Sequence, residues 1–182
     1  MRKKIYQLAL PILLLFSCNE KNELTATNDV VTGWNNLAVT IAEQHDHFYT
    51  FTGVRALTMA HVAMHDALNA IAPKFRQYAF FGTETSAHPI AAAAQAAHDV
   101  MNYLYPARQA NNSAELAFWL GQVPDGRSKT DGINLGKASP AAIINARAND
   151  KMLVFGEYAP QQPLEPGDYR FVPPLEFVYR PA

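Results

Sequence analysis

The feature that most constrains the fold is a set of regularly spaced small residues in the stretch 55–71. These alanines recur every three or four positions, which places them on one side of an α-helix: Ala60, Ala63, Ala67 and Ala70. A stripe of larger side chains runs beside them: Leu57, His61, Met64, Leu68 and Ile71. Small side chains at this spacing let a second helix approach closely. We therefore expect residues 55–71 to form a central, buried helix that Thr50 or Thr52 caps and Pro73 stops.

Length and composition indicate one globular domain. The chain has 182 residues, of which 49% are hydrophobic and 17% are charged. This balance is typical of a folded protein with a sizeable core. The net charge of -1 offers no excess of basic residues for a polyanion, so no nucleic-acid partner is expected.

The first 17 residues have the pattern of a secretory signal. Three basic residues, Arg2, Lys3 and Lys4, precede an apolar run at 5–16 that is too short for a comfortable membrane span. The run ends at Cys18, the only cysteine, and polar residues follow. This boundary resembles a bacterial lipoprotein signal, in which the cysteine is lipidated. We predict an exported protein, lipid-anchored at Cys18 in the bacterial cell envelope; the alternative is an ordinary signal peptide with an incidental cysteine.

The rest of the chain is predicted to be all-α, a helical bundle with a proline-rich extended arm at its C-terminal end. No stretch alternates convincingly as a strand does. Besides the central helix, helical periodicity covers 28–45, 87–104, 108–120 and 128–151. Residues 1–17 are assigned to the signal peptide, 18–27 to a flexible tether, 28–155 to the helical portion and 156–182 to the arm, which should lie across a surface.

Several details of these helices follow from single residues. Thr85 or Ser86 is placed to cap the alanine-rich helix 87–104, whose alanines match the small face of the central helix. Pro140 either kinks one helix in 128–151 or begins a second one after Ser139. The aromatic segment 75–81 is expected to be irregular and packed down. In 128–151 the expected inner side consists of Leu135, Ala138, Ala142, Ile143 and Ala146.

Histidines on the helices raise the question of a metal site. His61 and His65 are four residues apart and can face one ion, and His98 and Asp99 can add ligands. However, His61 lies in an apolar stripe, and no third ligand has a diagnostic spacing. Hydrogen-bonded structural histidines are therefore the preferred interpretation, and no metal is predicted.

Other arrangements that support catalysis are not evident. His65 and Asp66 are adjacent on a helix, so they point about 100° apart and should not form a dyad. Arg55 and Asp66 are too far apart along the helix to pair, so each is expected to anchor a neighbouring helix or the chain before it. The glycines are scattered rather than gathered in a phosphate-binding loop. Ser128 and Ser139 lack the context of an activated nucleophile.

One group of residues resembles a known family. The stretch 55–71, with Arg55, Met59-Ala60-His61 and Met64 to Ile71, followed by Pro73 and Tyr78, is similar to the N-terminal half of vanadium-dependent haloperoxidase-like proteins. These belong to the type 2 phosphatidic acid phosphatase (PAP2) superfamily. The resemblance extends from about Trp34 to the end of the sequence. Its further matches are Ala97-His98-Asp99-Val100, the segment 132–136, Arg147 near Asp150, Tyr158-Ala159-Pro160, Pro166-Gly167 and Pro173-Pro174.

The resemblance implies a larger haloperoxidase- or phosphatase-like helical fold and an oxyanion site that holds vanadate or a phosphoryl group. In that family Lys, two Arg, Ser-Gly and His form the site, because a tetrahedral oxyanion needs several fixed cationic and N–H donors. This sequence has no Ser-Gly-His, and Pro173 stands where the lysine that precedes Arg180-Pro181 is required. We therefore assign no catalytic, cofactor-binding or metal residue in this chain. Vanadate is implied only for a complete family member.

The sequence is thus interpreted as the N-terminal scaffold portion of such a protein, truncated before its catalytic half. Halide oxidation by peroxide or phosphoester hydrolysis would be the reaction of the complete protein. The expected partners are the missing C-terminal half, or further copies that associate through exposed apolar helices, and a membrane through the lipid anchor. The competing interpretation is a non-enzymatic helical module of the cell surface.

Overall fold

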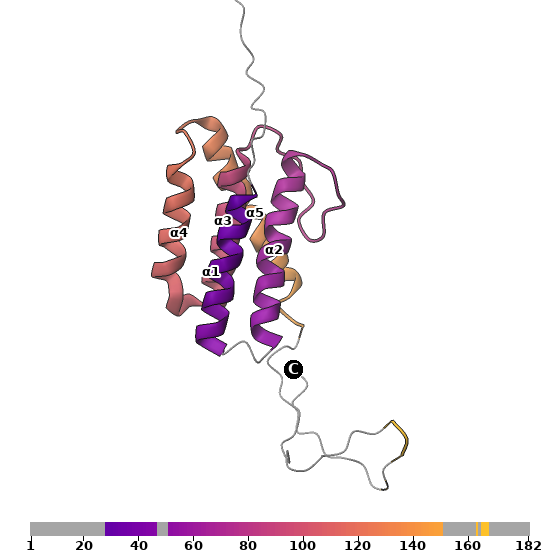
Figure 1. Cartoon of the computed structure of the whole chain (residues 1–182). Coiled ribbons are helices and arrows are strands. Elements are labelled where there is room, and N and C mark those ends of the chain that lie inside the picture. The colour runs from indigo at the N-terminus through magenta and orange to yellow at the C-terminus, as the bar shows by residue number, and fades with distance from the viewer. Residues whose placement is uncertain (1–27, 47–50, 151–162, 164, 168–182) are drawn as a thin grey trace, which may run out of the picture.

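The computed structural model describes residues 28–46, 51–150, 163 and 165–167, and over these residues it is helical without a strand. Consecutive α-helices alternate in direction and pack side by side as a bundle (Figure 1). The all-α prediction is confirmed. The predicted signal peptide, Cys18 with its tether, and most of the arm at 156–182 lie outside the described residues. The elements are α1 (Asp29–Asp46), α2 (Phe51–Ile71), α3 (Pro89–Leu104), the 3₁₀ turn η1 (Pro106–Arg108), α4 (Gln109–Gly121) and α5 (Arg127–Ala146).

The helix at the centre of the bundle is α3, and the prediction that residues 55–71 occupy this place was wrong. α3 contacts α1, α2, α4 and α5. All of its residues from 91 to 97 are buried, and all of these except Gln95 are alanines. A helix with methyl side chains on every side can accept neighbours all round, because no large side chain keeps their backbones away. α2 instead keeps one side open, where Val54 is 52% exposed.

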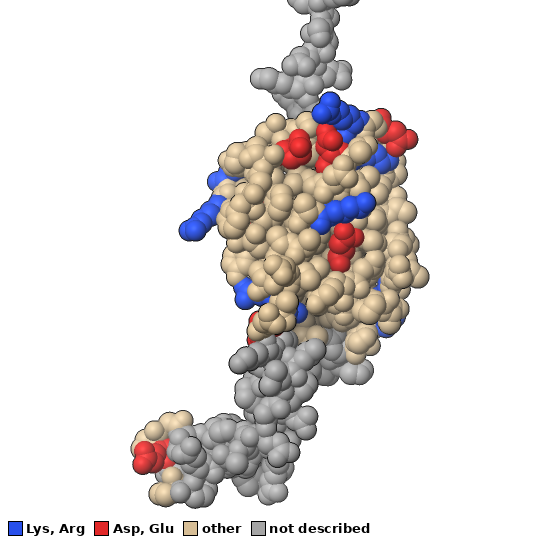
Figure 2. Space-filling view, turned by 180° about the vertical axis from the view of Figure 1, so that it is seen from behind, with Lys and Arg blue, Asp and Glu red and all other residues tan. Residues whose placement is uncertain are grey.

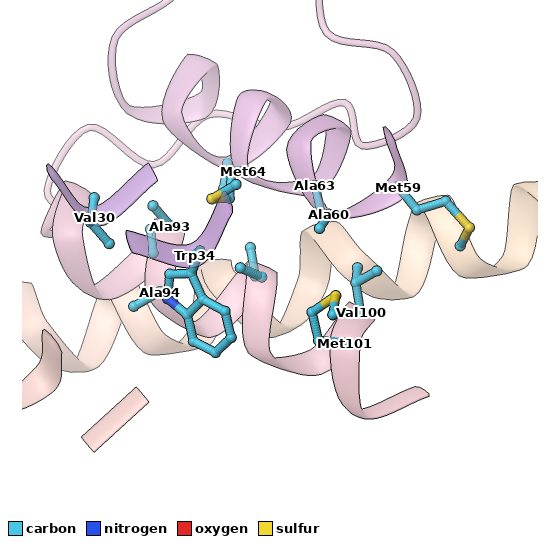
Figure 3. Close-up of a cluster of buried hydrophobic side chains, with 14 of the residues drawn as sticks. Val30, Trp34, Met59, Ala60, Ala63, Met64, Ala93, Ala94, Val100 and Met101 are labelled. Carbon is cyan, nitrogen blue, oxygen red and sulfur yellow. The ribbon is translucent and has the colours of Figure 1, made fainter. Parts of the chain in front are cut away.

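The predicted pairing of α2 with α3 is confirmed. Ala60, Ala63, Ala67 and Ala70 of α2 are buried, and α2 contacts α3. Larger side chains fill the space that remains around this contact, with Trp34 from α1, Met64 from α2 and Met101 from α3 (Figure 3). Few cavities remain where small and large residues interdigitate in this way, and such packing stabilises a core.

Glycines let α5 approach α3 closely. The sequence analysis treated the glycines as scattered and did not predict this role. A Cβ atom on Gly132 would lie 2.7 Å from the carbonyl oxygen of His88, and one on Gly136 would lie 2.6 Å from that of Ala92. The inner side of α5 is therefore rotated from the predicted one. Leu135 and Ile143 are buried as expected, but Ala138 and Ala146 are exposed; the buried residues of α5 are Gly132, Leu135, Gly136, Ser139, Pro140 and Ile143.

α5 is one continuous helix, so Pro140 does not begin a second one. Pro140 has no N–H to donate, and a proline within a helix usually costs about 3 kcal/mol. Beside it, the hydroxyl of the buried Ser139 donates to the carbonyl oxygen of Ala63 on α2 at 2.7 Å. This bond joins α5 to α2 at the level of the proline.

The predicted cap of α3 was wrong, whereas for α2 only Thr52 of the two predicted candidates is excluded. Thr52 lies inside the first turn of α2 rather than before it, and Thr50 lies outside the described residues. α3 begins at Pro89, whose missing N–H suits a first helical position, and not near Thr85 or Ser86. His88 precedes the first residue of α3, and its N–H donates to the carbonyl oxygen of Ser128 at the beginning of α5. The beginning of α3 is therefore attached to α5 through the backbone, and no side chain caps it.

None of the described helices is both long and apolar enough to cross a membrane.

We predict that Gly136→Ala destabilises the protein although alanine favours helices by about 1 kcal/mol over glycine. The new methyl group would collide with backbone atoms of α3, and overpacking of this kind costs about 1–3 kcal/mol. Urea unfolding should show a net loss of stability. The control is Gly121→Ala, because a Cβ atom there meets nothing within 4 Å. Equal or greater stability of Gly136→Ala would show that the two helices do not need this close approach.

Candidate functional site

The most elaborate polar arrangement in the described residues is built around Asp66. Its side chain is fully buried on α2. One carboxylate oxygen accepts the N–H of Tyr78 at 2.7 Å, and the other accepts those of Ala79 and Phe80 at 2.7 and 2.8 Å. Hydrogen bonds to a carboxylate contribute about 1.5–3 kcal/mol each, so this anchor is strong. Asp66 therefore holds the loop 72–88 that follows α2, and not a helix or the chain before it.

Two amide side chains complete the attachment of this loop. The side-chain oxygen of Asn69 accepts the N–H groups of Lys74 and Phe75, while its amide group donates to the carbonyl oxygen of His65. Gln77 donates to the carbonyl oxygens of Asp66 and Gly82. Sequence analysis missed Gln77, because a single glutamine in a loop carries no recognisable pattern.

The aromatic residues of the loop are mostly exposed, which corrects the expectation that they pack down. Phe75 and Phe81 are each 71% exposed and Tyr78 is 54% exposed, whereas Phe80 is partly buried. The backbone of the loop is held by Asp66 and Asn69, whatever its rings contribute. We call Phe75 and Phe81 the aromatic pair of the loop.

Arg55 and Arg147 connect α2, the loop and the end of α5. The guanidinium of Arg55 donates to the carboxylate of Asp150 at 2.9 Å and to the carbonyl oxygen of Arg147 at 3.0 Å. The guanidinium of Arg147 bonds to the hydroxyl of Tyr78 and lies 5.5 Å from the centre of its ring. The prediction that Arg55 anchors a neighbouring helix is confirmed.

A groove of about 730 Å³ lies between the open side of α2 and the loop. Its floor is mainly apolar, and polar side chains stand along its length. We call it the α2 groove; it is lined by Val54, Leu57, Thr58, His61, Val62, His65, Arg76 and Tyr78.

The two histidines of the groove are each held by a protein partner. The Nε2 atom of His61 lies 3.0 Å from the side-chain oxygen of Asn35 on α1. The Nε2 atom of His65 lies 3.1 Å from the carbonyl oxygen of Arg76, and its Nδ1 atom lies 3.3 Å from the amide nitrogen of Asn69. Partial burial lowers the pKa of His61, because its charged form loses hydration. Each histidine therefore serves to connect α2 to a neighbouring segment.

His98 and Asp99 do not join these histidines. The Nδ1 atom of His98 lies 2.7 Å from the carboxylate of Asp99, and its Nε2 atom lies 2.9 Å from the amide of Asn102. Asn112 of α4 donates in turn to Asn102 at 2.8 Å. Adjacent helical residues thus do pair here, where both side chains are only partly buried. Within the described part of the chain, no three potential metal ligands of the His, Cys, Asp or Glu type lie together.

The two serines considered as nucleophiles have structural contacts. Ser139 is fully buried and donates to Ala63, so a substrate cannot reach it. Ser128 supplies the carbonyl oxygen that meets the N–H of His88. Of the other residues that carried functional expectations, Pro173 and Arg180 lie outside the described residues.

Three basic side chains in the described residues pair with separate carboxylates. Arg127 lies near Asp131, Lys129 pairs with Asp125, and Arg55 pairs with Asp150. A tetrahedral oxyanion requires several cations aimed at one point. In these three pairs each cation faces a carboxylate of its own instead.

We predict that Asp66→Asn lowers the free energy of unfolding by about 2–4 kcal/mol. The amide keeps one acceptor oxygen but turns donor hydrogens toward backbone N–H groups that also donate. Urea unfolding measures the loss, and hydrogen exchange should quicken in the loop 72–88. The matched control is Asp125→Asn, whose carboxylate is 96% exposed and should change stability little. A stable Asp66→Asn variant with an unchanged loop would contradict the anchoring role.

We also predict that His61 makes stability fall on acidification. Because its pKa is lower in the folded than in the unfolded state, the unfolded chain binds more protons, and stability is lost as pH falls below about 6.5, the ordinary histidine value. The His61→Gln variant should lose less stability than the wild type between about pH 7.5 and 5.5. In Asn35→Asp, a carboxylate beside His61 should favour its charged form and reduce the loss too. Identical pH dependences of stability in all three proteins would show that His61 does not cause the loss of stability on acidification.

Comparisons of the chain with protein-family models, with curated proteins and with solved structures found no match.

Proposed function

We propose that this chain is the helical scaffold portion of an exported protein of the vanadium-dependent haloperoxidase-like or PAP2-like type, and that it carries no oxyanion site of its own. The observation that supports this most directly is the use of Asp66. The acidic residue in the centre of the family-like stretch accepts three backbone N–H groups and leaves no oxygen directed at a substrate. The stretch therefore acts as a structural support.

Other parts of the family resemblance also coincide with structural contacts. Arg55 attaches the end of α5, and Asn69 attaches the loop after α2. The stretch 132–136 contains the two glycines that let α5 approach α3. Ala97 and Val100 are buried in the centre of the bundle. Residues that fix the relative positions of helices are those that a scaffold requires.

Catalysis would need additional polypeptide. The full sequence has no Ser-Gly-His, and Pro173 replaces the lysine expected before Arg180. Vanadate would then be bound by a catalytic half that this sequence does not contain. The alternative function, a non-enzymatic helical module of the cell surface, is favoured by the same missing residues.

A catalytic half, or another copy of the chain, would bind the exposed apolar surface. This surface is smaller than the exposed apolar helices expected from the sequence. The middle of α3 is covered by its four neighbours, and most of the large apolar side chains that remain exposed lie on α2 and on the loop after it, with Tyr103 on α3 and Phe118 on α4 besides. The aromatic pair, Phe75 and Phe81, stands out from this loop with most of its area in water. On the face seen from behind, charged side chains are most numerous near one end, while others stand at the middle of the face and near the opposite end (Figure 2). We propose the aromatic pair as the centre of this contact.

We predict that the chain alone neither oxidises halide with vanadate and peroxide nor hydrolyses phosphoesters. Removing the charged groups of such a site typically costs several kcal/mol of transition-state stabilisation each. The same assays on a longer protein, extended through the downstream reading frame, provide the comparison. Activity of the extended protein supports the scaffold proposal, and a stop codon directly after Ala182 supports the non-enzymatic module. Vanadate-dependent turnover by the 182-residue chain itself would overturn both.

We further propose that the mature protein begins at a lipidated Cys18 and is held at the bacterial envelope. The support is the apolar run that ends at this residue and the polar residues that follow it. Mass spectrometry of the protein purified from membranes should show an acyl-bearing Cys18 at the N-terminus, and Cys18→Ser should shift the protein to the soluble fraction. An unmodified N-terminus at a later residue would mean that an ordinary signal peptide is removed.

A further inference from the structure

Much of the apolar surface of the α2 groove lies open to water. Val54, at one end of the groove, is 52% exposed, and Tyr78, on the opposite wall, is 54% exposed. Leu57 and Val62 lie between them and are only partly buried. A contiguous apolar surface of this kind usually binds another segment or molecule. The question is which segment fits it.

The polypeptide that follows α5 starts at the edge of this groove. Arg55 follows Val54 directly, and it holds both the carbonyl oxygen of Arg147 and the carboxylate of Asp150. Arg147 in turn lies against Tyr78, which lines the groove. Whatever follows Asp150 in the chain therefore begins beside the groove.

The chemistry of residues 171–179, Phe-Val-Pro-Pro-Leu-Glu-Phe-Val-Tyr, matches that surface. Two adjacent prolines favour an extended polyproline conformation, which commonly binds along aromatic-lined surfaces. Apolar and aromatic side chains flank the prolines. The one acidic residue of this stretch, Glu176, is complementary to Arg76 in the groove lining.

The connecting length is also suitable. The groove follows α2 from Val54 to His65, which is about 16 Å at 1.5 Å per residue. Five or six residues of an extended segment, at about 3 Å each, span that distance. Residues 151–170 connect Asp150 to the stretch, and a random-coil chain of this length has an end-to-end distance of about 25 Å. We propose that the α2 groove binds residues 171–179 of the same chain.

The proposal predicts measurable protection of a defined stretch. A linker of this kind gives an effective concentration of about 1 mM. If the groove binds the stretch with a dissociation constant of about 0.1 mM, exchange of its amide hydrogens slows about tenfold. Hydrogen–deuterium exchange of the full chain should show this slowing in residues 171–179, and the slowing should not change when the protein is diluted.

Two variants with matched exposure separate the groove from general surface effects. Val54→Asp places a charge in the groove and should return exchange of 171–179 to the unprotected rate. Phe118→Asp places the same charge on α4, where Phe118 is 58% exposed and does not line the groove, and should leave the protection intact. Circular dichroism is the control that shows whether both variants keep their helices.

Three results would overturn the proposal. The first is exchange of residues 171–179 at the unprotected rate in the wild type. The second is protection that persists in Val54→Asp. The third is protection that disappears on dilution, which would assign the groove to a second copy of the chain.

Discussion

The close approach of helix backbones around α3 is the constraint on which the rest of the bundle depends. Alanines on α3 and on α2, and glycines on α5, remove the side-chain volume that normally keeps helices about 8–10 Å apart. At such short separations many weak dispersion contacts add up, which compensates for the small apolar area that each methyl group buries. It also lets the Ser139 hydroxyl reach the backbone of Ala63. Larger residues, such as Trp34 and Met101, belong to the same buried core.

Periodicity was enough to predict the helices and the pairing of α2 with α3, because both depend on local spacing. It could not identify the central helix. An alanine-rich helix and a helix with one alanine stripe look alike until the number of neighbours is known, and that number is a property of the whole fold. The glycines at 132 and 136 did carry a signal, since four-residue spacing puts both on one side of α5. Their role could not be predicted from α5 alone, because it depends on the backbone of α3, which lies against both glycines.

The polar contacts were less predictable, for a related reason. Asp66 could be recognised as an anchor, but its partners are backbone N–H groups twelve to fourteen residues further on, and a backbone donor leaves no trace in a sequence. The same holds for His88 and the carbonyl oxygen of Ser128. The anchoring role of Arg55 was easier to predict, because its main partner, Asp150, has a charged side chain. The hydroxyl of Ser139 bonds within the core, so the general preference of serine for caps and surfaces gave no guide.

Asp66 binds the backbone of the loop and not its side chains. These hydrogen bonds therefore do not depend on which side chains the loop carries. Every amino acid except proline carries the N–H group that this carboxylate accepts. The three hydrogen bonds to Asp66 are therefore still possible when other side chains, proline excepted, stand at 78, 79 and 80. A protein with such an attachment can acquire a new surface specificity by substitutions in one short segment, without rebuilding the bundle beneath it.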